Sequence, residues 1–150
     1  MGNCIKTSHP YTYKDTVVFV PPVTYGRVIK VYDGDTVTIA SKLPYYTSPV
    51  YRFSIRLNGI DTPEIRGSDE DEKEVAILAR AALYDKIFGK NIRLKNCKTE
   101  KYGRILADVY LDEININTWM LENRYAVKYD GGKKISPESW SNYHHNKNQV

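Results

Sequence analysis

The 150-residue chain is poor in cysteine and has no long apolar run. Its two cysteines, Cys4 and Cys97, are too few for a disulfide scaffold, so we expect a reducing compartment. No stretch of about 18 consecutive apolar residues is present, and the N-terminus lacks the apolar core of a signal peptide. We therefore expect an intracellular protein that is not secreted and spans no membrane, and the sequence implies no obligate protein partner.

The chain also lacks the clusters of histidine and cysteine that bind zinc. It has only three histidines, and two of them, His144 and His145, lie in a polar C-terminal stretch where we expect them to be solvated. No histidine and cysteine set here therefore offers a zinc site, whereas carboxylate and carbonyl oxygens suit a hard cation.

Neither sign of charge dominates the composition. A net charge of +4, from 22 basic and 18 acidic residues, permits a nucleic-acid partner without demanding one. Hydrophobic residues make up 41% of the chain, which is enough for one core at this length. The 13 tyrosines are open to three interpretations, as core residues, as an interface or as stacking surfaces for bases.

Alternating apolar and polar residues predict a chain built mainly from β-strands. Asp33-Gly34 predicts a tight turn inside a hairpin, and the prolines and tyrosines of Ser41–Val50 predict a loop. The expected segments are a flexible arm over residues 1–15, a short strand at Val17–Val20, and longer strands over 24–32, 36–39, 51–58, from Ile92 onward and over 104–111.

Two helices interrupt the predicted strands. Apolar residues at 75, 78, 79, 82, 83 and 87 predict one face of a helix over residues 70–88, with Ser68 as its N-cap and Gly89 ending it. A short helix is expected over residues 117–123, with Trp119 and Met120 facing the core.

This order of elements predicts an α+β fold, a five-stranded OB-fold β-barrel with one helix between strands 3 and 4 and a short helix after strand 5. We expect this domain to occupy residues 16–135. A polar tail then covers 136–150, with one helical turn starting at Ser136-Pro137.

The stretch from Arg56 to Glu64 ends the third strand in charged and turn-forming residues. Arg56 precedes Asp61 by five positions and Glu64 follows it by three, so a guanidinium and two carboxylates can converge on one point. A divalent cation and a phosphodiester require such groups. The alternative is that Asp61 or Thr62 caps a helix whose first residue is Pro63.

Three motifs, taken in order, resemble the active site of the staphylococcal nuclease family. They are Tyr32-Asp33-Gly34-Asp35-Thr36, Arg56 with Asp61-Thr62-Pro63-Glu64, and Lys101-Tyr102-Gly103-Arg104. The resemblance covers residues from about 24 to 130 and implies an OB-fold barrel that hydrolyses DNA and RNA with calcium.

Carried over residue by residue, the resemblance implies a role for each charged group. Asp35, Asp61 and the backbone carbonyl of Thr62 would bind Ca²⁺, and Glu64 would hold or deprotonate the attacking water. Arg56 and Arg104 would grip the phosphate, for which the planar fork of arginine suits two oxygens at once. The alternative for the two arginines is a buried ion pair with the same carboxylates.

The chain also departs from the family pattern. Ser41–Val50 is long, an acidic run follows Gly67, and no long helix is expected after Gly132. Tyr129 lies near the position of a stacking aromatic residue, although a different sequence follows it.

These features predict a calcium-dependent nuclease that acts on DNA, RNA or both and favours single strands, whose splayed bases can stack on tyrosines. The alternative function is a non-catalytic SNase-like or OB-fold module that binds nucleic acid or protein.

The N-terminus, Met1-Gly2-Asn3-Cys4, resembles that of proteins myristoylated on glycine and palmitoylated on a nearby cysteine. Lys6 stands where the usual pattern has serine or threonine, so an unmodified N-terminus is the alternative. Two acyl chains, on Gly2 and Cys4, would anchor the protein to a membrane surface stably, whereas one would not. The protein would then lie on the cytoplasmic face of a membrane, and otherwise in the cytoplasm.

Overall fold

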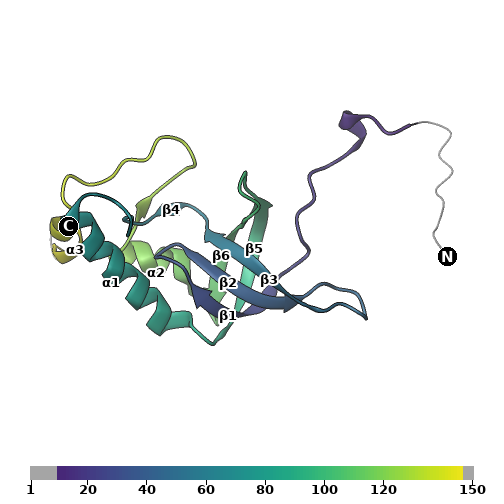
Figure 1. The fold of residues 1–150 in the computed structure, drawn as a ribbon, viewed down its shortest axis with the longest axis horizontal. Helices are drawn as coiled ribbons and strands as arrows, with labels where there is room; N and C mark the ends of the chain where they lie inside the picture. Colours follow the sequence, from purple (N-terminus) through teal and green to yellow (C-terminus); the bar gives the residue numbers. More distant parts are fainter. Residues whose placement is uncertain (1–9, 147–150) are drawn as a thin grey trace.

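A closed barrel of five strands forms the centre of the computed structural model, which describes residues 10–146 (Figure 1). The strands are β1 (Tyr25–Val31), β2 (Thr36–Lys42), β3 (Val50–Leu57), β5 (Asn91–Thr99) and β6 (Ile105–Leu111). They pair in the order β3-β2-β1-β5-β6, and parallel pairing of β3 with β6 closes the barrel. With α1 (Glu70–Ile87) between β3 and β5 and α2 (Ile116–Glu122) after β6, the predicted OB-fold is confirmed.

The barrel interior is filled by apolar side chains that alternate along the strands. In β6, residues 105, 107, 109 and 111 are buried while the residues between them are half-buried, as expected when successive side chains point to opposite faces. The core also takes Met120 from α2, and the half-buried Trp119 packs at its edge. The short strand β7 (Ile114–Asn115) pairs with β6 just before α2.

Helix α1 packs one apolar face against the barrel, and most of the residues whose spacing predicted this face are buried. Leu78, however, is 40% exposed, and Ala76 is buried in addition.

The N-cap of α1 is Asp69, whose side chain accepts a hydrogen bond from the Asp71 amide, so the prediction of Ser68 was wrong by one residue. Gly89 has φ +73°, a left-handed conformation that glycine adopts without steric cost, and this ends the helix as predicted.

The segment before β1 leads away from the barrel on the side opposite α1 and α3 (Figure 1). The short 3₁₀ helix η1 (Tyr13–Asp15) lies in it. The predicted strand at Val17–Val20 is wrong, because these residues pair with no strand in the described part of the chain, and Val17 is 95% exposed. Their β propensity is not enough without a neighbouring strand to pair with. Gly2 and Cys4 lie outside the described residues.

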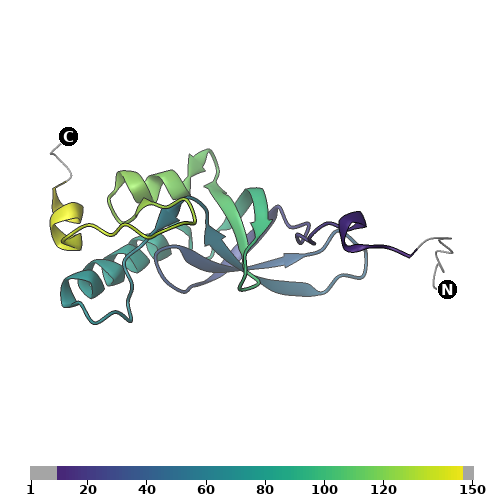
Figure 2. The ribbon, with the colours of Figure 1, turned by 90° about the horizontal axis from the view of Figure 1, so that it is seen from above.

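Two elements in the C-terminal part were not predicted. Strand β8 (Val127–Lys128) pairs with β4 (Ile60–Asp61), and α3 (Trp140–His145) packs against α1. Figure 2 shows the chain returning from the barrel towards α3. The predicted helical turn at Ser136-Pro137 was misplaced, because the helix starts after its N-cap Ser139.

Helix α3 lies in the segment predicted as a polar tail, so the packed structure extends past residue 135. Trp140 and His144 are 3% and 8% exposed, so the expectation of a solvated His144 was wrong, while His145 is exposed. No helix within residues 10–146 has the length and apolar character needed to cross a membrane.

Candidate active site

The site lies where β2, β3 and β6 meet at the closure of the barrel. Arg56 of β3 faces Thr36 of β2 on one side and Leu106 of β6 on the other. The Leu57 amide donates to the Asp35 carbonyl at 2.8 Å, which joins the end of β3 to the turn before β2. The strand register therefore places Asp35 and Arg56 side by side.

The β1–β2 turn brings Asp35 close to the segment after β4. A Cβ added to Gly34 would lie 3.0 Å from Thr62 Cγ2 and 3.1 Å from Ala79 Cβ, so the turn packs tightly against both Thr62 and α1. The Asp35 amide donates to Asp33 Oδ1 at 3.1 Å, which stabilises the turn. Glycine at position 34 thus allows a close approach that a larger residue would obstruct.

Arg56 joins the two predicted carboxylate ligands. Its Nη2 lies 3.2 Å from Asp35 Oδ2 and 3.4 Å from Asp61 Oδ1, and its Nη1 donates to the carbonyls of Leu57 and Ile60. Arg56, Asp35 and Asp61 are only 8%, 6% and 5% exposed. The buried ion pair that the sequence left as an alternative for this arginine is therefore present.

Thr62 is bonded to the first of these carboxylates. Its amide and hydroxyl donate to Asp35 Oδ2 at 3.2 and 3.0 Å. Asp61 belongs to β4, and the next helix begins only at Glu70, so the alternative of a helix cap over Pro63 is wrong. The stretch instead forms a corner, as the leading interpretation predicted.

Two acidic groups of the pocket, Asp61 and Asp33, have raised pKa values. Burial raises the pKa of Asp61, an effect that its contacts with Lys134 and Arg56 oppose. Burial and the nearby negative charge of Asp35 raise the pKa of Asp33 to about 6. Negative charge is therefore incompletely compensated at the site, and an added cation would be favoured there.

Glu64 stands at the edge of the site with a 64% exposed side chain. Its amide donates to Glu72 Oε1 at 3.0 Å, which fixes the segment after the corner to α1. Lys134 Nζ lies 3.2 Å from Glu64 Oε1 and 3.0 Å from Asp61 Oδ1, so one ammonium group bridges the two carboxylates.

Lys134 and Glu72 are among the residues at the site that sequence reasoning missed. Lys134 reaches the site because β8 pairs with β4, which carries the C-terminal segment back to the corner. Glu72 belongs to an acidic run that was interpreted as charge favouring the helix dipole. Lys133-Lys134 after Gly131-Gly132 was visible in the sequence, but nothing local indicated what it faces.

Arg104 reaches the site from the start of β6. Its Nε bonds to the Glu100 carboxylate, a contact that raises the pKa of Arg104. Its guanidinium carbon lies 5.7 Å from the ring centroid of Tyr102, which is 72% exposed. No bond from the two terminal nitrogens of Arg104 to another residue within 10–146 is present, so they can bind a ligand.

One open pocket of about 720 Å³ collects these groups. The predicted residues that line it are Asp35, Arg56, Asp61, Thr62, Glu64, Arg104 and the half-buried Tyr129. Within the described chain no three His, Cys, Asp or Glu side chains cluster as a complete metal site. The set here is two carboxylates, which suits a hard cation completed by carbonyl and water oxygens rather than zinc.

The fold and the pocket together define a class of protein. Its members are OB-fold domains in which an arginine contacts two carboxylates at the end of the barrel. The family model of staphylococcal nuclease homologues matches residues 54–148. The chain therefore belongs to the staphylococcal nuclease homologue family.

Similar proteins come from distant organisms. An uncharacterized endonuclease of Haemophilus influenzae is 32% identical over 103 residues, which cover 69% of this chain and 51% of that protein. A probable endonuclease of Schizosaccharomyces pombe is 32% identical over 133 residues, with 74% of this chain and 58% of that protein covered. A probable staphylococcal-like nuclease of Oryza sativa is 31% identical over 75 residues, covering 50% of this chain and 19% of that protein. The chain thus spans about half the length of the first two relatives.

Proposed function

We propose that the protein is a calcium-dependent nuclease that hydrolyses phosphodiester bonds of DNA, RNA or both. The observation that carries the proposal is the convergence of Asp35, Asp61, Glu64 and Arg104 on one pocket. Membership of the family and the endonuclease names of the two relatives support it.

The residues of the corner fit a calcium ion. Asp35, Asp61 and the backbone carbonyl of Thr62 would hold it, and all three offer the oxygen atoms that this cation prefers. The two carboxylates are nearly buried, and burial raises the pKa of Asp61, so added positive charge would stabilise its ionised form. When bound, the ion supplies positive charge that stabilises the negative charge developing on the phosphoryl oxygens.

The other charged groups act on water and on the phosphate. Glu64, exposed at the pocket edge, would hold a water molecule and accept its proton. The terminal nitrogens of Arg104 would bind phosphate oxygens. Arg56, whose terminal nitrogens already bind carbonyls and carboxylates, keeps the two calcium ligands together and adds its charge to the phosphate site.

The lining of the pocket supports a preference for single strands. The corner must approach the backbone closely, and the exposed Tyr102 and half-buried Tyr129 can stack on bases only when the bases are unpaired.

Incubating the purified protein with single-stranded DNA and with RNA, in calcium and in excess chelator, tests the proposal. We expect hydrolysis of at least one substrate with calcium and none with chelator. Binding without hydrolysis in calcium would instead identify the non-catalytic module that is the alternative function. Acylation of Gly2 and Cys4, and a place on the cytoplasmic face of a membrane, stay predictions.

A further inference from the structure

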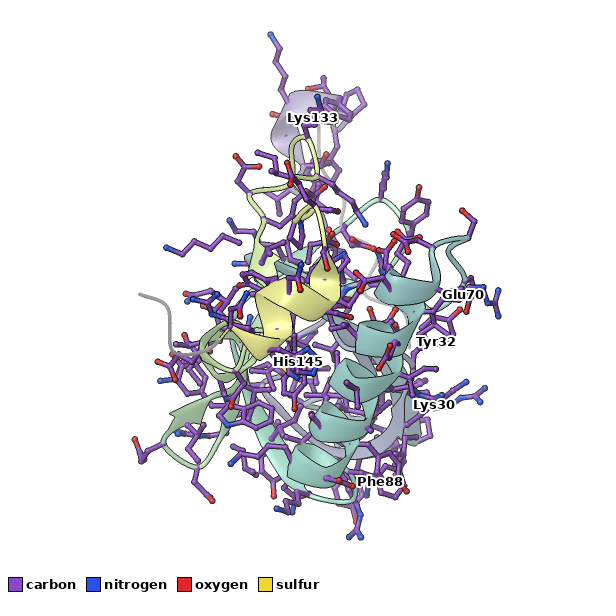
Figure 3. All side chains as sticks on the ribbon, turned by 90° about the vertical axis from the view of Figure 1, so that its left-hand side faces the viewer. Lys30, Tyr32, Glu70, Phe88, Lys133 and His145 are labelled. Atoms are coloured by element: carbon purple, nitrogen blue, oxygen red, sulfur yellow. The ribbon has the colours of Figure 1, made fainter. Side chains whose placement is uncertain are left out.

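The wall of the pocket beside α1 carries a tyrosine and two basic side chains that the proposed chemistry does not use. Tyr32, directly after β1, is 49% exposed and lines the same pocket as Asp35. Lys30 Nζ lies 5.7 Å from the centroid of the Tyr32 ring. Figure 3 shows both residues on one flank of α1, with Tyr32 nearer the Glu70 end.

The third member of this set comes from α1 itself. Arg80 Nε donates to the Val31 carbonyl at 3.3 Å, so its guanidinium is held next to the end of β1. Arg80 and Lys30 both line the pocket. We call Lys30, Tyr32 and Arg80 the α1-side set.

The position of this set relative to the proposed calcium ligands is fixed by the fold. The Tyr32 amide donates to the Thr36 carbonyl at 2.9 Å, which closes a turn. Within this turn Tyr32 precedes Asp35 by three residues. The same turn packs against Ala79, the neighbour of Arg80 on α1. A ligand that contacts the α1-side set therefore meets groups whose arrangement is already formed.

The two cationic side chains of the α1-side set, unlike those at the centre of the pocket, are not paired with carboxylates within residues 10–146. Arg56, Arg104 and Lys134 are each paired with carboxylates. Within residues 10–146, Lys30 and Arg80 take part in no ion pair, so their charge remains available for a phosphate.

We propose that Lys30, Tyr32 and Arg80 form a subsite for a nucleotide that flanks the scissile phosphate in a single strand. The base stacks on the Tyr32 ring, and the phosphate beyond it contacts Lys30 and Arg80. This inference rests on the proposed function and extends it, because it assigns binding groups outside the catalytic corner.

With this subsite, an extended strand would contact more groups of the pocket than a single nucleotide would. Lys101 and Tyr102 repeat the same combination on the β5–β6 turn, with Lys101 Nζ 5.0 Å from the ring centroid. Both sets line the pocket that holds the acidic corner, so a strand several nucleotides long can contact both. Stacking on two tyrosines requires unpaired bases, which selects single strands.

The test measures the affinity of a fluorescein-labelled ten-nucleotide oligothymidylate by fluorescence anisotropy in calcium. The full chain carries Glu64→Gln so that the oligonucleotide stays intact. Adding Tyr32→Ala is expected to raise Kd about fivefold or more, the lower end of what one base–aromatic stack contributes. Tyr32→Phe keeps the ring and should leave Kd within about twofold. Lys30→Gln with Arg80→Gln should lower the slope of log Kd against log salt.

Tyr46→Ala is the matched control, because Tyr46 is a fully exposed tyrosine in the β2–β3 loop, away from the pocket. Circular dichroism checks that each variant is folded. Equal Kd values for Tyr32→Ala and Tyr46→Ala, with an unchanged salt slope in the basic-residue variant, would overturn the subsite and leave the nuclease proposal standing. If the parent protein itself binds no oligonucleotide, the subsite and nucleic-acid recognition fail together. If Tyr32→Ala does not fold, the salt slope of the Lys30→Gln and Arg80→Gln variant tests the subsite. A lower slope supports the subsite, and an unchanged slope overturns it.

Discussion

Charged side chains that contact one another form the centre of this site. Arg56 is nearly buried between Asp35 and Asp61, and each of its terminal nitrogens has two partners. Removing one partner from a buried ionic cluster lowers the free energy of unfolding by more than the whole cluster contributes to it, because the remaining charges are left uncompensated. A calcium ion bound at the proposed site would therefore neutralise the same two carboxylates as Arg56.

Arg56→Ala should lower the free energy of unfolding by about 3 kcal/mol when calcium is absent, because two nearly buried carboxylates lose their counter-charge. Calcium should restore part of this loss. Urea unfolding with calcium and with chelator measures both effects. Arg52→Ala is the control, since Arg52 is an exposed arginine on the same strand and should change stability by less than about 0.5 kcal/mol. Equal losses in the two variants would contradict the role given to Arg56.

Lys134 occupies a place next to Asp61 that a cation would share. Burial lowers the pKa of Lys134, but the hydrogen bonds and charges of Asp61 and Glu64 outweigh this effect and raise it, so the side chain is charged at neutral pH. Lys134→Met should therefore tighten calcium binding by about threefold, the scale of a partly exposed ion pair.

Isothermal titration calorimetry with calcium measures this change without relying on activity. Lys133→Met is the control, because the exposed Lys133 makes no ion pair within the described residues. If both lysine variants bind calcium as the unaltered protein does, Lys134 does not compete with the cation.

At the scale of the elements, α2 is attached to the corner through one buried side chain. Asn117 accepts from the Val109 amide at 3.0 Å and donates to the carbonyls of Asn58 and Ala107 at 2.8 and 3.2 Å. It thereby joins α2 to β6 and to the turn between β3 and β4 that leads into the corner. The Ala107 carbonyl also accepts from the Asn58 amide at 2.9 Å, whereas the Val109 amide and the Asn58 carbonyl bond to the Asn117 side chain.

Asn117→Ala should lower the free energy of unfolding by about 2–3 kcal/mol, since it leaves buried backbone groups without a hydrogen bond. Urea denaturation provides the measurement. Thr118→Ala changes the exposed neighbour on the same helix and should have little effect. A loss for Asn117→Ala no larger than that for Thr118→Ala would show that the network does not stabilise the fold.

Helix α3 is joined to α1 through Asp71, which accepts from the Ser139 hydroxyl and the Ser141 amide. Hydrogen bonding by Ser141, and then by Ser139 and Trp140, lowers the pKa of Asp71 below its ordinary value of 3.8. A lowered pKa means that the ionised form favours the packed state. The contact therefore stabilises the packing above about pH 3.8, and this contribution is lost as pH falls through the lowered pKa.

Asp71→Asn should weaken the packing of α3 on α1 already at pH 7. The further loss of this packing as pH falls should then be smaller than in the unaltered protein. In a Trp119→Phe background Trp140 is the one remaining tryptophan, so its emission reports whether it stays buried. We expect Asp71→Asn to shift this emission to longer wavelength. Glu74→Gln, at an exposed position on α1, should not. Unshifted emission in Asp71→Asn would remove Asp71 from the packing of α3.

In the molecule as a whole, the features that were predicted correctly are those that local sequence patterns determine. The barrel strands and α1 follow from alternation, helical spacing and turn residues such as Asp33-Gly34 and Gly89. Asp35, Arg56, Asp61, Thr62, Glu64 and Arg104 lie within the three motifs, so their convergence could be expected from chain order, whereas Arg80 and Lys134 lie outside them.

The missed features depend on contacts between distant segments. The two-residue strands β4 and β8 are too short to leave a pattern, yet their pairing brings Lys134 to Asp61. Helix α3 has only two buried residues, Trp140 and His144, in a polar stretch. Val17–Val20 shows the opposite error, because it has strand propensity but no partner strand within the described residues.

The proposed nuclease activity depends on Glu64, which lies beside the carboxylates of Asp35 and Asp61 and would activate water for phosphodiester hydrolysis. The most direct test compares turnover of a single-stranded oligonucleotide in saturating calcium by the unaltered protein, by Glu64→Gln and by Glu138→Gln, an exposed control outside the pocket. Glu64→Gln should lower turnover at least ~10²-fold, the scale of losing a positioned general base, with its fold intact, while Glu138→Gln should leave turnover unchanged. Equal turnover in all three proteins would contradict the claim.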